Sequence, residues 1–262
     1  MAKKGPPRWL QAARLRREAA KPGERSDWLA RALGRAGVMP RAEAEAALRQ
    51  GRVTVDGVAV TEPFAPVRED ALVRVDGQAV SLRADVLVLM FHKPAGLVTA
   101  GTDPEGVGTV FEHLRRALPA PLARYEWLAV GRLDRDTTGL LLFTNEETLV
   151  AHATSPDSHL PKRYEAEVAG QPTDAALEPL RQGVGLDDGP ARPAEARVLG
   201  PSRVELILTE GRHHQVKRML AAVGHPVRRL HRAAYAGLTV EGLEPGAWRE
   251  LEPSEVERLR TT

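Results

Sequence analysis

From Val86 onward, short apolar stretches alternate with short helical patterns, and this succession limits the fold more than any other feature of the chain. Strands are expected at 86–91, 126–130, 140–144, 163–169, 195–199, 203–209, 227–231 and 236–240. Helices are expected at 109–117, 146–153, 173–182, 213–223 and 253–260. Because the strands lack regular crossover helices, the pattern predicts an α+β domain over 86–262, built on a mostly antiparallel sheet.

Residues 25–81 are expected to form a separate compact unit that begins with two short helices. Ser26 is a suitable N-cap for a helix over Asp27–Leu33. Pro40 suits the first position of a second helix over 40–50, which Gly51 would end. So small a unit has a thin core, which favours binding over catalysis in this part of the chain.

Two β-hairpins are expected to follow these helices. Asp56-Gly57 is a strong hairpin signal, and valines flank it on both sides. A further short strand over Leu72–Val75 leads into Asp76-Gly77, which repeats the signal.

Composition narrows the class of protein. The chain has 262 residues, enough for one large domain or two modest ones. It contains no Cys, which excludes disulfides and thiolate chemistry. Apolar runs stay well short of the roughly 20 residues of a membrane span, and the basic first residues lack the apolar stretch of a signal peptide. We therefore expect a cytoplasmic protein without a membrane partner.

Positive charge is concentrated in two places, although the net charge is only +2. Residues 1–24 are expected to form a flexible basic arm. Residues 203–232 contain Arg203, Arg212, Lys217, Arg218, Arg228, Arg229 and Arg232 against two acids. Such concentrations favour a polyanion partner, and the alternative is a solvated Arg-rich face.

Several kinds of chemistry lack their motifs. The chain has no GxxxxGK[ST] loop and no GxGxxG after a strand, so nucleotide hydrolysis and dinucleotide redox chemistry are unsupported. The eight His have no HExxH spacing, which disfavours a metal site, and GxSxG is absent. His213 and His214 are adjacent and are expected to point to different sides of a helix.

The segment GRLDRDTTGLLLFTN at 131–145 places Asp134 on a loop that runs into an apolar strand. A strand fixes the adjoining backbone, so Asp134 can be held still, as a nucleophile or general base requires. The simpler alternative is a turn carboxylate that accepts backbone N–H bonds. Asp136 is expected to cap this loop.

Three further side chains complete a candidate site. Tyr164 could stack on a planar base, with a surface aromatic of the sheet as the alternative. Lys217 could keep a nearby carboxylate ionised, with a plain helix-surface lysine as the alternative. Gln215 could hold a neighbouring loop. Such a set beside a basic surface can grip an unstacked nucleobase.

Four motifs in order carry a resemblance to a known family. They are KPAG at 93–96, GRLDRDTTGLLLFTN at 131–145, KRYEAEVAG at 162–170 and EGRHHQVKRMLAAVGHPVRRLHR at 210–232. Together they resemble the small-subunit family of pseudouridine synthases, and the likeness covers about 25–262. The HHQVKRM form is most similar to the family member that acts on one uridine of 16S ribosomal RNA.

The two helices and GRVTVDG of the first unit resemble the alpha-L RNA-binding motif. The resemblance implies that basic residues of these helices meet RNA phosphates. The candidates are Arg31, Arg35, Arg41, Arg49 and Arg52.

The resemblance also implies roles for site residues. Asp134 would be the catalytic carboxylate, Tyr164 would stack on the base and is a candidate for proton transfer, and Lys217 would pair with Asp134. The substrate-binding candidates are Leu230, which would pack on the base, Arg132, which would fill the gap left by a flipped nucleotide, and Arg218, Gln215 and Lys93.

The resemblance implies an isomerase that acts as a monomer on ribosomal RNA, without cofactor or metal. The expected target is 16S RNA. The alternatives are the same reaction on 23S RNA and a noncatalytic RNA-binding factor of ribosome assembly. A glycosidase with paired carboxylates is a poor third, because Asp134 and Asp136 are two residues apart on one loop.

Overall fold

The structure, a computed structural model, describes residues 26–103 and 106–261. The expected basic arm at 1–24 lies outside the described residues. The chain divides into two compact units. One comprises the residues up to Val86 together with Leu118–Trp127, and the other comprises Leu87–Ala117 and the chain from Leu128 onward.

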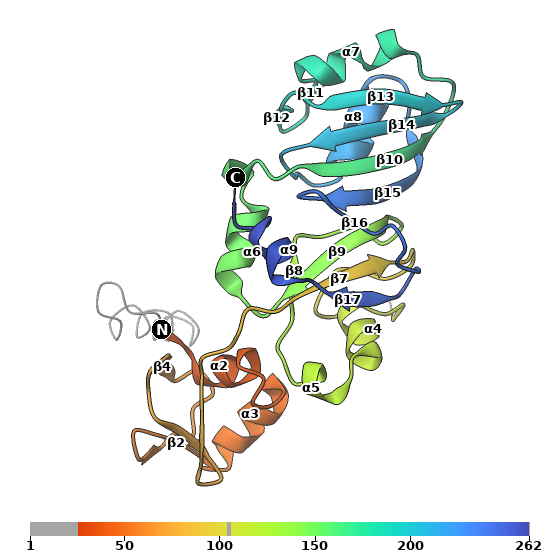
Figure 1. The fold of residues 1–262 in the computed structure, drawn as a ribbon. Helices are drawn as coiled ribbons and strands as arrows, with labels where there is room; N and C mark the ends of the chain where they lie inside the picture. The colour runs from red at the N-terminus through yellow and green to blue at the C-terminus, as the bar shows by residue number, and fades with distance from the viewer. Residues whose placement is uncertain (1–25, 104–105, 262) are drawn as a thin grey trace, which may run out of the picture. The chain divides into compact units, whose positions relative to one another are not determined.

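The second unit is built on a nine-stranded sheet within the described residues (Figure 1). Its main path is β13 (Glu195–Gly200), β14 (Arg203–Leu208), β10 (Lys162–Val168), β15 (Val227–Tyr235), β9 (Thr138–Thr144), β7 (Val88–Lys93) and β17 (Trp248–Glu250). β16 (Leu238–Thr239) pairs with β15, and β8 (Leu128–Val130) pairs with β9. Each pair is antiparallel except β15 with β9, so the expected α+β class with a mostly antiparallel sheet is confirmed.

The parallel pair joins the two halves of this sheet at a glycine. Gly139 of β9 lies opposite Arg232 of β15 and has a φ of +111°. A Cβ atom at position 139 would lie 2.2 Å from the Arg232 carbonyl oxygen. Only glycine can combine this backbone conformation with so close an approach. The start of β9, next to the Asp134 loop, is thereby held against β15.

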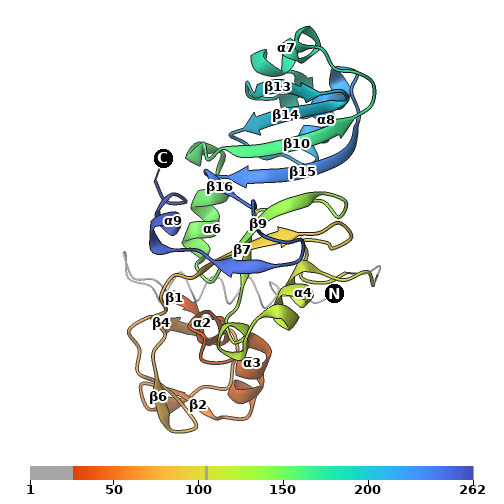
Figure 2. The same ribbon diagram turned by 45° about the vertical axis from the view of Figure 1, so that its right-hand side comes forward.

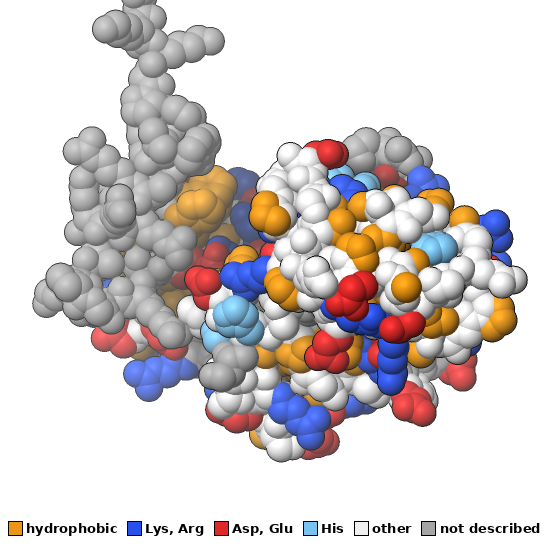
Figure 3. Space-filling model, turned by 90° about the horizontal axis from the view of Figure 1, so that it is seen from above, with side chains coloured by type: hydrophobic (Ala, Val, Ile, Leu, Met, Phe, Trp, Pro, Cys, Tyr) orange, Lys and Arg blue, Asp and Glu red, His pale blue; other side chains and the backbone are white. Residues whose placement is uncertain are grey.

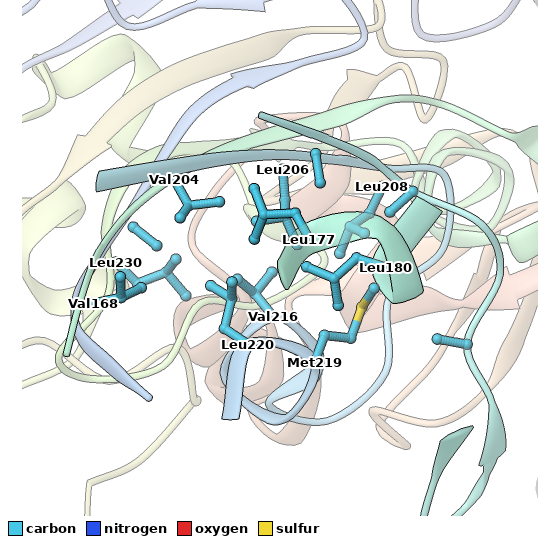
Figure 4. Close-up of a cluster of buried hydrophobic side chains, with 14 residues drawn as sticks. Val168, Leu177, Leu180, Val204, Leu206, Leu208, Val216, Met219, Leu220 and Leu230 are labelled. Carbon is cyan, nitrogen blue, oxygen red and sulfur yellow. The ribbon is translucent and has the colours of Figure 1, made fainter. Parts of the chain in front are cut away.

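One half of the sheet has its own apolar core, formed with α7 (Asp174–Gln182) and α8 (Gln215–Ala222) (Figure 4). In Figure 1, α8 lies behind β14 and β10. The two helices turn Leu177, Leu180, Met219 and Leu220 into this core at helical spacing, and all four are completely buried. Burial of this face fixes the rotation of α8, and with it the direction of the polar residues near its N-terminus.

The other half of the sheet is covered more fully. β7 and β9 carry unbroken buried runs, Val88–Phe91 and Leu140–Phe143, as strands with both faces covered do. The helices α4 (Val110–Ala117), α6 (Glu147–Thr154) and α9 (Pro253–Glu257) pack around them (Figures 1 and 2). The expected helices of this unit are therefore present, with ends shifted by a few residues.

Some short elements of the second unit were not expected. They are η1 (Pro156–Ser158), β11 (Gly185–Leu186), β12 (Gly189–Pro190) and β17. The strands expected at 227–231 and 236–240 have other bounds in the structure. β15 continues to Tyr235, and a turn at 236–237 leads into the short β16.

The first unit contains α2 (Leu29–Arg35) and α3 (Arg41–Arg49), followed by a small sheet in the order β3-β2-β5-β6. These strands are β2 (Val53–Val55), β3 (Val58–Ala59), β5 (Val73–Val75) and β6 (Gln78–Val80). Both expected hairpins are confirmed, since Asp56, Gly57, Asp76 and Gly77 all have positive φ, as the tight two-residue turn requires.

The expected N-cap at Ser26 is wrong. Ser26 belongs to β1 (Ser26–Trp28), which pairs with β4 (Pro66–Arg68), so the helix begins only at Leu29. Strand pairing with a distant segment overrides the local capping signal. Pro40 occupies the N-cap of α3 instead of its first turn, and Gly51 follows the end of that helix with a φ of 71°.

The segment Leu118–Trp127, with α5 (Ala120–Ala123), belongs to the first unit although it lies far along the chain. The Tyr125 ring fills the space beside Gly37, where a Cβ atom would lie 2.5 Å from the ring. Glu126 forms an ion pair of 3.1 Å with Arg41. These contacts explain why the strand expected from 126 begins only at Leu128.

Candidate active site

The loop that carries Asp134 connects β8 to β9, and hydrogen bonds from the side chain of Lys93 fix its backbone. Lys93 is completely buried on β7. Its ammonium group donates hydrogen bonds of 2.9–3.2 Å to the carbonyl oxygens of Pro94, Arg135 and Thr137. Burial lowers the pKa of Lys93 to about 8, while Asp136 and Asp134 oppose that shift. Lys93 therefore supports the loop from inside, and the structure does not bring it into the pocket described below.

Lys217 brings two carboxylates of this loop together. Its Nζ lies 3.0 Å from Asp134 Oδ2. It also donates hydrogen bonds of 2.7 and 2.9 Å to the two oxygens of Asp136. Lys217 is placed for both contacts because it lies in the first turn of α8, whose apolar face is buried. Asp134 and Lys217 thus meet as the sequence analysis expects.

These contacts change two pKa values. Burial works to lower the pKa of Lys217, but the hydrogen bonds to Asp136 and Asp134 outweigh it and raise the pKa. The hydrogen bond from Lys217 lowers the pKa of Asp136. Lys217 is therefore a cation, and Asp136 an anion, throughout the neutral range. Asp136 was expected only to cap the loop, and its role as a second partner of Lys217 was missed.

His214 is a further neighbour of Asp134 that the sequence analysis missed. Its Nε2 lies 3.3 Å from Asp134 Oδ1. Lys217 makes its contact with the other carboxylate oxygen, Oδ2. The expectation that His213 and His214 point to different sides of a helix is wrong. α8 begins only at Gln215, and the two rings stack with centroids 3.7 Å apart.

A pocket opens beside Asp134. It encloses about 420 Å³, a volume that includes its open mouth. Its walls combine the polar residues described above with two residues expected to touch a base, Tyr164 of β10 and Leu230 of β15. The lining residues are Arg132, Leu133, Asp134, Thr137, Tyr164, Leu208, Glu210, Gly211, Arg212, His214, Gln215, Val216, Lys217 and Leu230.

Gln215 fixes the rim of this pocket, as expected for a residue that holds a loop. Its buried side chain donates to Glu210 Oε1 at 2.5 Å and accepts from the Arg212 backbone N–H at 2.9 Å. Glu210 also accepts from the backbone N–H of Arg192. Hydrogen bonds through Gln215 and Glu210 therefore fix the turn that leads into α8.

The structure places Arg218 elsewhere. Its guanidinium donates to both oxygens of Asp188, at 2.8 and 3.1 Å, and it does not line the pocket among the described residues. The expected basic patch at 203–232 is largely compensated in the same way. Acids within 4 Å of its cations include Glu165 at Arg203, Asp188 at Arg212 and Glu167 at Arg229, while Arg232 is buried. On the face that Figure 3 shows, basic side chains likewise lie beside acidic ones.

Most of the arginines expected to bind RNA in the first unit also have acidic neighbours. Arg35 lies 3.3 Å from Asp27, and Arg52 contacts Asp76. Arg41 and Arg49 both pair with Glu45 of α3. Arg31 lies on α2 and is half-buried. Their contact with RNA stays a prediction.

Comparisons with known proteins show the family to which this chain belongs. Residues 87–222 match the family model described as RNA pseudouridylate synthase. The chain belongs to this family. It is therefore an isomerase of the pseudouridine synthase class, which supports the expected enzyme over a noncatalytic binding factor.

Relatives and a solved structure extend the match over most of this pseudouridine synthase. "Ribosomal large subunit pseudouridine synthase B" of Bacillus subtilis (strain 168) is 36% identical over 238 residues, which cover 88% of this chain and 95% of the relative. The protein of that name from Escherichia coli (strain K12) is 37% identical over 245 residues, covering 90% and 82%. A solved structure entitled "Crystal structure of pseudouridylate synthase" is 30% identical, with a TM-score of 0.62 and coverage of 88% and 98%. The names of the two relatives do not support the expected small-subunit target.

Two other properties of the described residues bear on function. No group of three or more His, Asp or Glu side chains within 26–103 and 106–261 is arranged to hold a metal ion. Over the same residues, each helix is too short or too polar to cross a membrane.

Proposed function

We propose that this chain isomerises a uridine of large-subunit ribosomal RNA to pseudouridine, with Asp134 as the catalytic carboxylate. The observation that carries the proposal is the 3.0 Å ion pair of Asp134 with Lys217 at the wall of a pocket that also exposes Tyr164. An extruded pyrimidine nucleoside could be bound and attacked at such a pocket, because it combines an ionised carboxylate, a fixed cation and an aromatic ring.

The target uridine has to leave its stack to reach Asp134. Unstacking costs a few kcal/mol, and contacts to phosphates and stacking on Tyr164 can offset it. Leu230 belongs to the buried core and lines the pocket, so it supplies an apolar wall for the base. Arg132 is exposed at the mouth of the pocket, where it can occupy the place that the flipped nucleotide leaves.

The chemical step needs a carboxylate whose charge is maintained. Asp134 assists cleavage of the bond between C1′ and N1, either by adding to the ribose or by supporting a glycal route. The uracil turns and its C5 joins C1′, after which the C5 proton leaves and N1 gains one. The product has the same atoms as the substrate, so the reaction needs no energy input. Tyr164 is the candidate for the proton transfer at C5.

The choice of the large subunit rests on the relatives. Both named above carry a large-subunit designation and match most of this chain. Their support outweighs the likeness of HHQVKRM to the 16S enzyme, because that likeness concerns seven residues. The arginines of the first unit are proposed to add RNA contacts.

The target is tested with two transcripts, one of large-subunit and one of small-subunit ribosomal RNA, each labelled with tritium at uridine C5. Tritium release from the large-subunit transcript alone is expected. Release only from the small-subunit transcript would contradict the choice of target, and release from neither would contradict the proposed reaction on these RNAs.

A further inference from the structure

We propose that His214 is a positioning residue for Asp134, holding one carboxylate oxygen while Lys217 holds the other. The proposal rests on the assignment of Asp134 as the catalytic carboxylate. His214 Nε2 lies 3.3 Å from Asp134 Oδ1, and Lys217 Nζ lies 3.0 Å from Asp134 Oδ2. Contacts on both oxygens restrict rotation of the carboxylate about its last bond.

The backbone of His214 supports a role for its side chain. His214 has a φ of 50° and a ψ of 29°, in the left-handed region that disfavours most residues other than glycine. Glycine or asparagine would occupy this position at lower cost. Left-handed non-glycine residues persist where the surroundings enforce them, and they occur often at functional sites. The left-handed backbone at His214 fits such a functional position.

The surroundings of His214 do enforce this conformation. The residue before α8 is fixed through Gln215, whose side chain bonds both Glu210 and the Arg212 backbone. The His214 carbonyl oxygen accepts from the Arg218 backbone N–H at 3.0 Å, which anchors it to the first turn of α8. These bonds fix the backbone from which the imidazole reaches Asp134.

Packing does not account for the ring. The His214 side chain is 45% exposed, so the core does not require it. The groups that face it are Asp134, the stacked ring of His213 and, at longer range, Asp136. An ionised carboxylate only accepts hydrogen bonds, so His214 can donate to Asp134 only in a form that carries a proton on Nε2. Such contacts at active sites are often long without substrate and shorten when it binds.

The test compares His214→Gly with His159→Gly. His159 is also an exposed histidine with a left-handed backbone, at a φ of 48°, but it lies after η1 and does not line the pocket. Both changes relieve the same backbone strain, and only the first removes a ring from Asp134. Single-turnover tritium release and RNA affinity are measured for both variants and the wild type, with and without added imidazole.

We expect His214→Gly to lose about 10- to 100-fold in single-turnover rate, the cost typical of a misplaced reacting group, while its RNA affinity stays near that of the wild type. Added imidazole should restore part of this rate, and His159→Gly should match the wild type with or without imidazole. His214→Asn, which tolerates the same backbone, serves if His214→Gly does not fold, and its rate should fall as well.

An unchanged rate in the His214 variants, a loss confined to RNA affinity, or a rate loss in His214→Gly that imidazole does not restore would overturn the proposal. Failure of the proposed function has a different signature, because the wild type would then release no tritium.

Discussion

The ammonium group of Lys217 lies 2.7 Å from Asp136, a shorter contact than the 3.0 Å to Asp134. One cation thus serves two carboxylates of the same loop. Asp136 is 71% exposed at its side chain, whereas the Asp134 side chain is 28% exposed and lines the pocket. The two acids therefore share a partner but differ in access to substrate, and this difference can be measured.

Asp136→Asn should reduce the activity only modestly. An exposed ion pair contributes about 1 kcal/mol or less, so the single-turnover rate should fall by no more than about fivefold. Lys217 then pairs with Asp134 alone. A loss as complete as that of Asp134→Asn would show that Asp136 takes part in the chemistry.

Lys217→Met should raise the pKa of Asp136 toward the ordinary aspartate value of about 3.9, because the hydrogen bond that lowers it is lost. Carboxyl carbon NMR titration measures this. Arg218→Met is the matched control, since Arg218 lowers the pKa of Asp188 in the same way. It should raise the pKa of Asp188 and leave that of Asp136 where it is. An Asp136 titration unaffected by Lys217→Met would contradict the pairing.

Gly139→Ala should destabilise the second unit by more than about 3 kcal/mol, because it combines a forbidden conformation with a core clash. The clash is with the Arg232 carbonyl oxygen. Gly237→Ala is the control, because Gly237 has a positive φ but open space around it, and it should cost only about 1–2 kcal/mol. Urea unfolding distinguishes them. Equal losses in the two variants would argue against the close approach of β9 and β15.

Stability should fall as the pH drops below about 6.5, the ordinary pKa of histidine, partly because of His231. Burial, and then the neighbouring His92, lower the pKa of His231 in the folded state. The unfolded chain therefore takes up the proton first, and protonation favours unfolding. His231→Gln should flatten this part of the stability curve, whereas exposed His213→Gln should not. Identical curves for His231→Gln and the wild type would contradict this source of acid sensitivity.

Local signals predicted much of the fold. Strands such as β7 and β9 follow from unbroken apolar runs, and both Asp-Gly hairpins from their turn chemistry. Ser26 shows the limit, because its pairing with Arg68 in β1 and β4 depends on a segment 42 residues away. Leu118–Trp127 shows the same limit. Its contact with the first unit depends on the fit of Tyr125 at Gly37, and no hydrophobic pattern in the sequence signals that contact.

The site was predictable as far as the placement of Asp134, Tyr164 and Lys217 at one pocket, while their roles stay predictions. Its supporting residues were not. The sequence does not reveal that Lys93 faces inward to three carbonyls, that Arg218 turns to Asp188, or that His214 precedes α8 and faces Asp134. Each of these depends on the direction of a side chain that only the folded backbone fixes.

The most direct test of the central claim is single-turnover tritium release from C5-labelled large-subunit ribosomal RNA by Asp134→Asn. Asp187→Asn, which removes an exposed carboxylate outside the pocket, is the control, and RNA affinity is measured in parallel. We predict no release above background by Asp134→Asn, with RNA affinity near that of the wild type and full release by the control. Substantial release by Asp134→Asn would contradict the account.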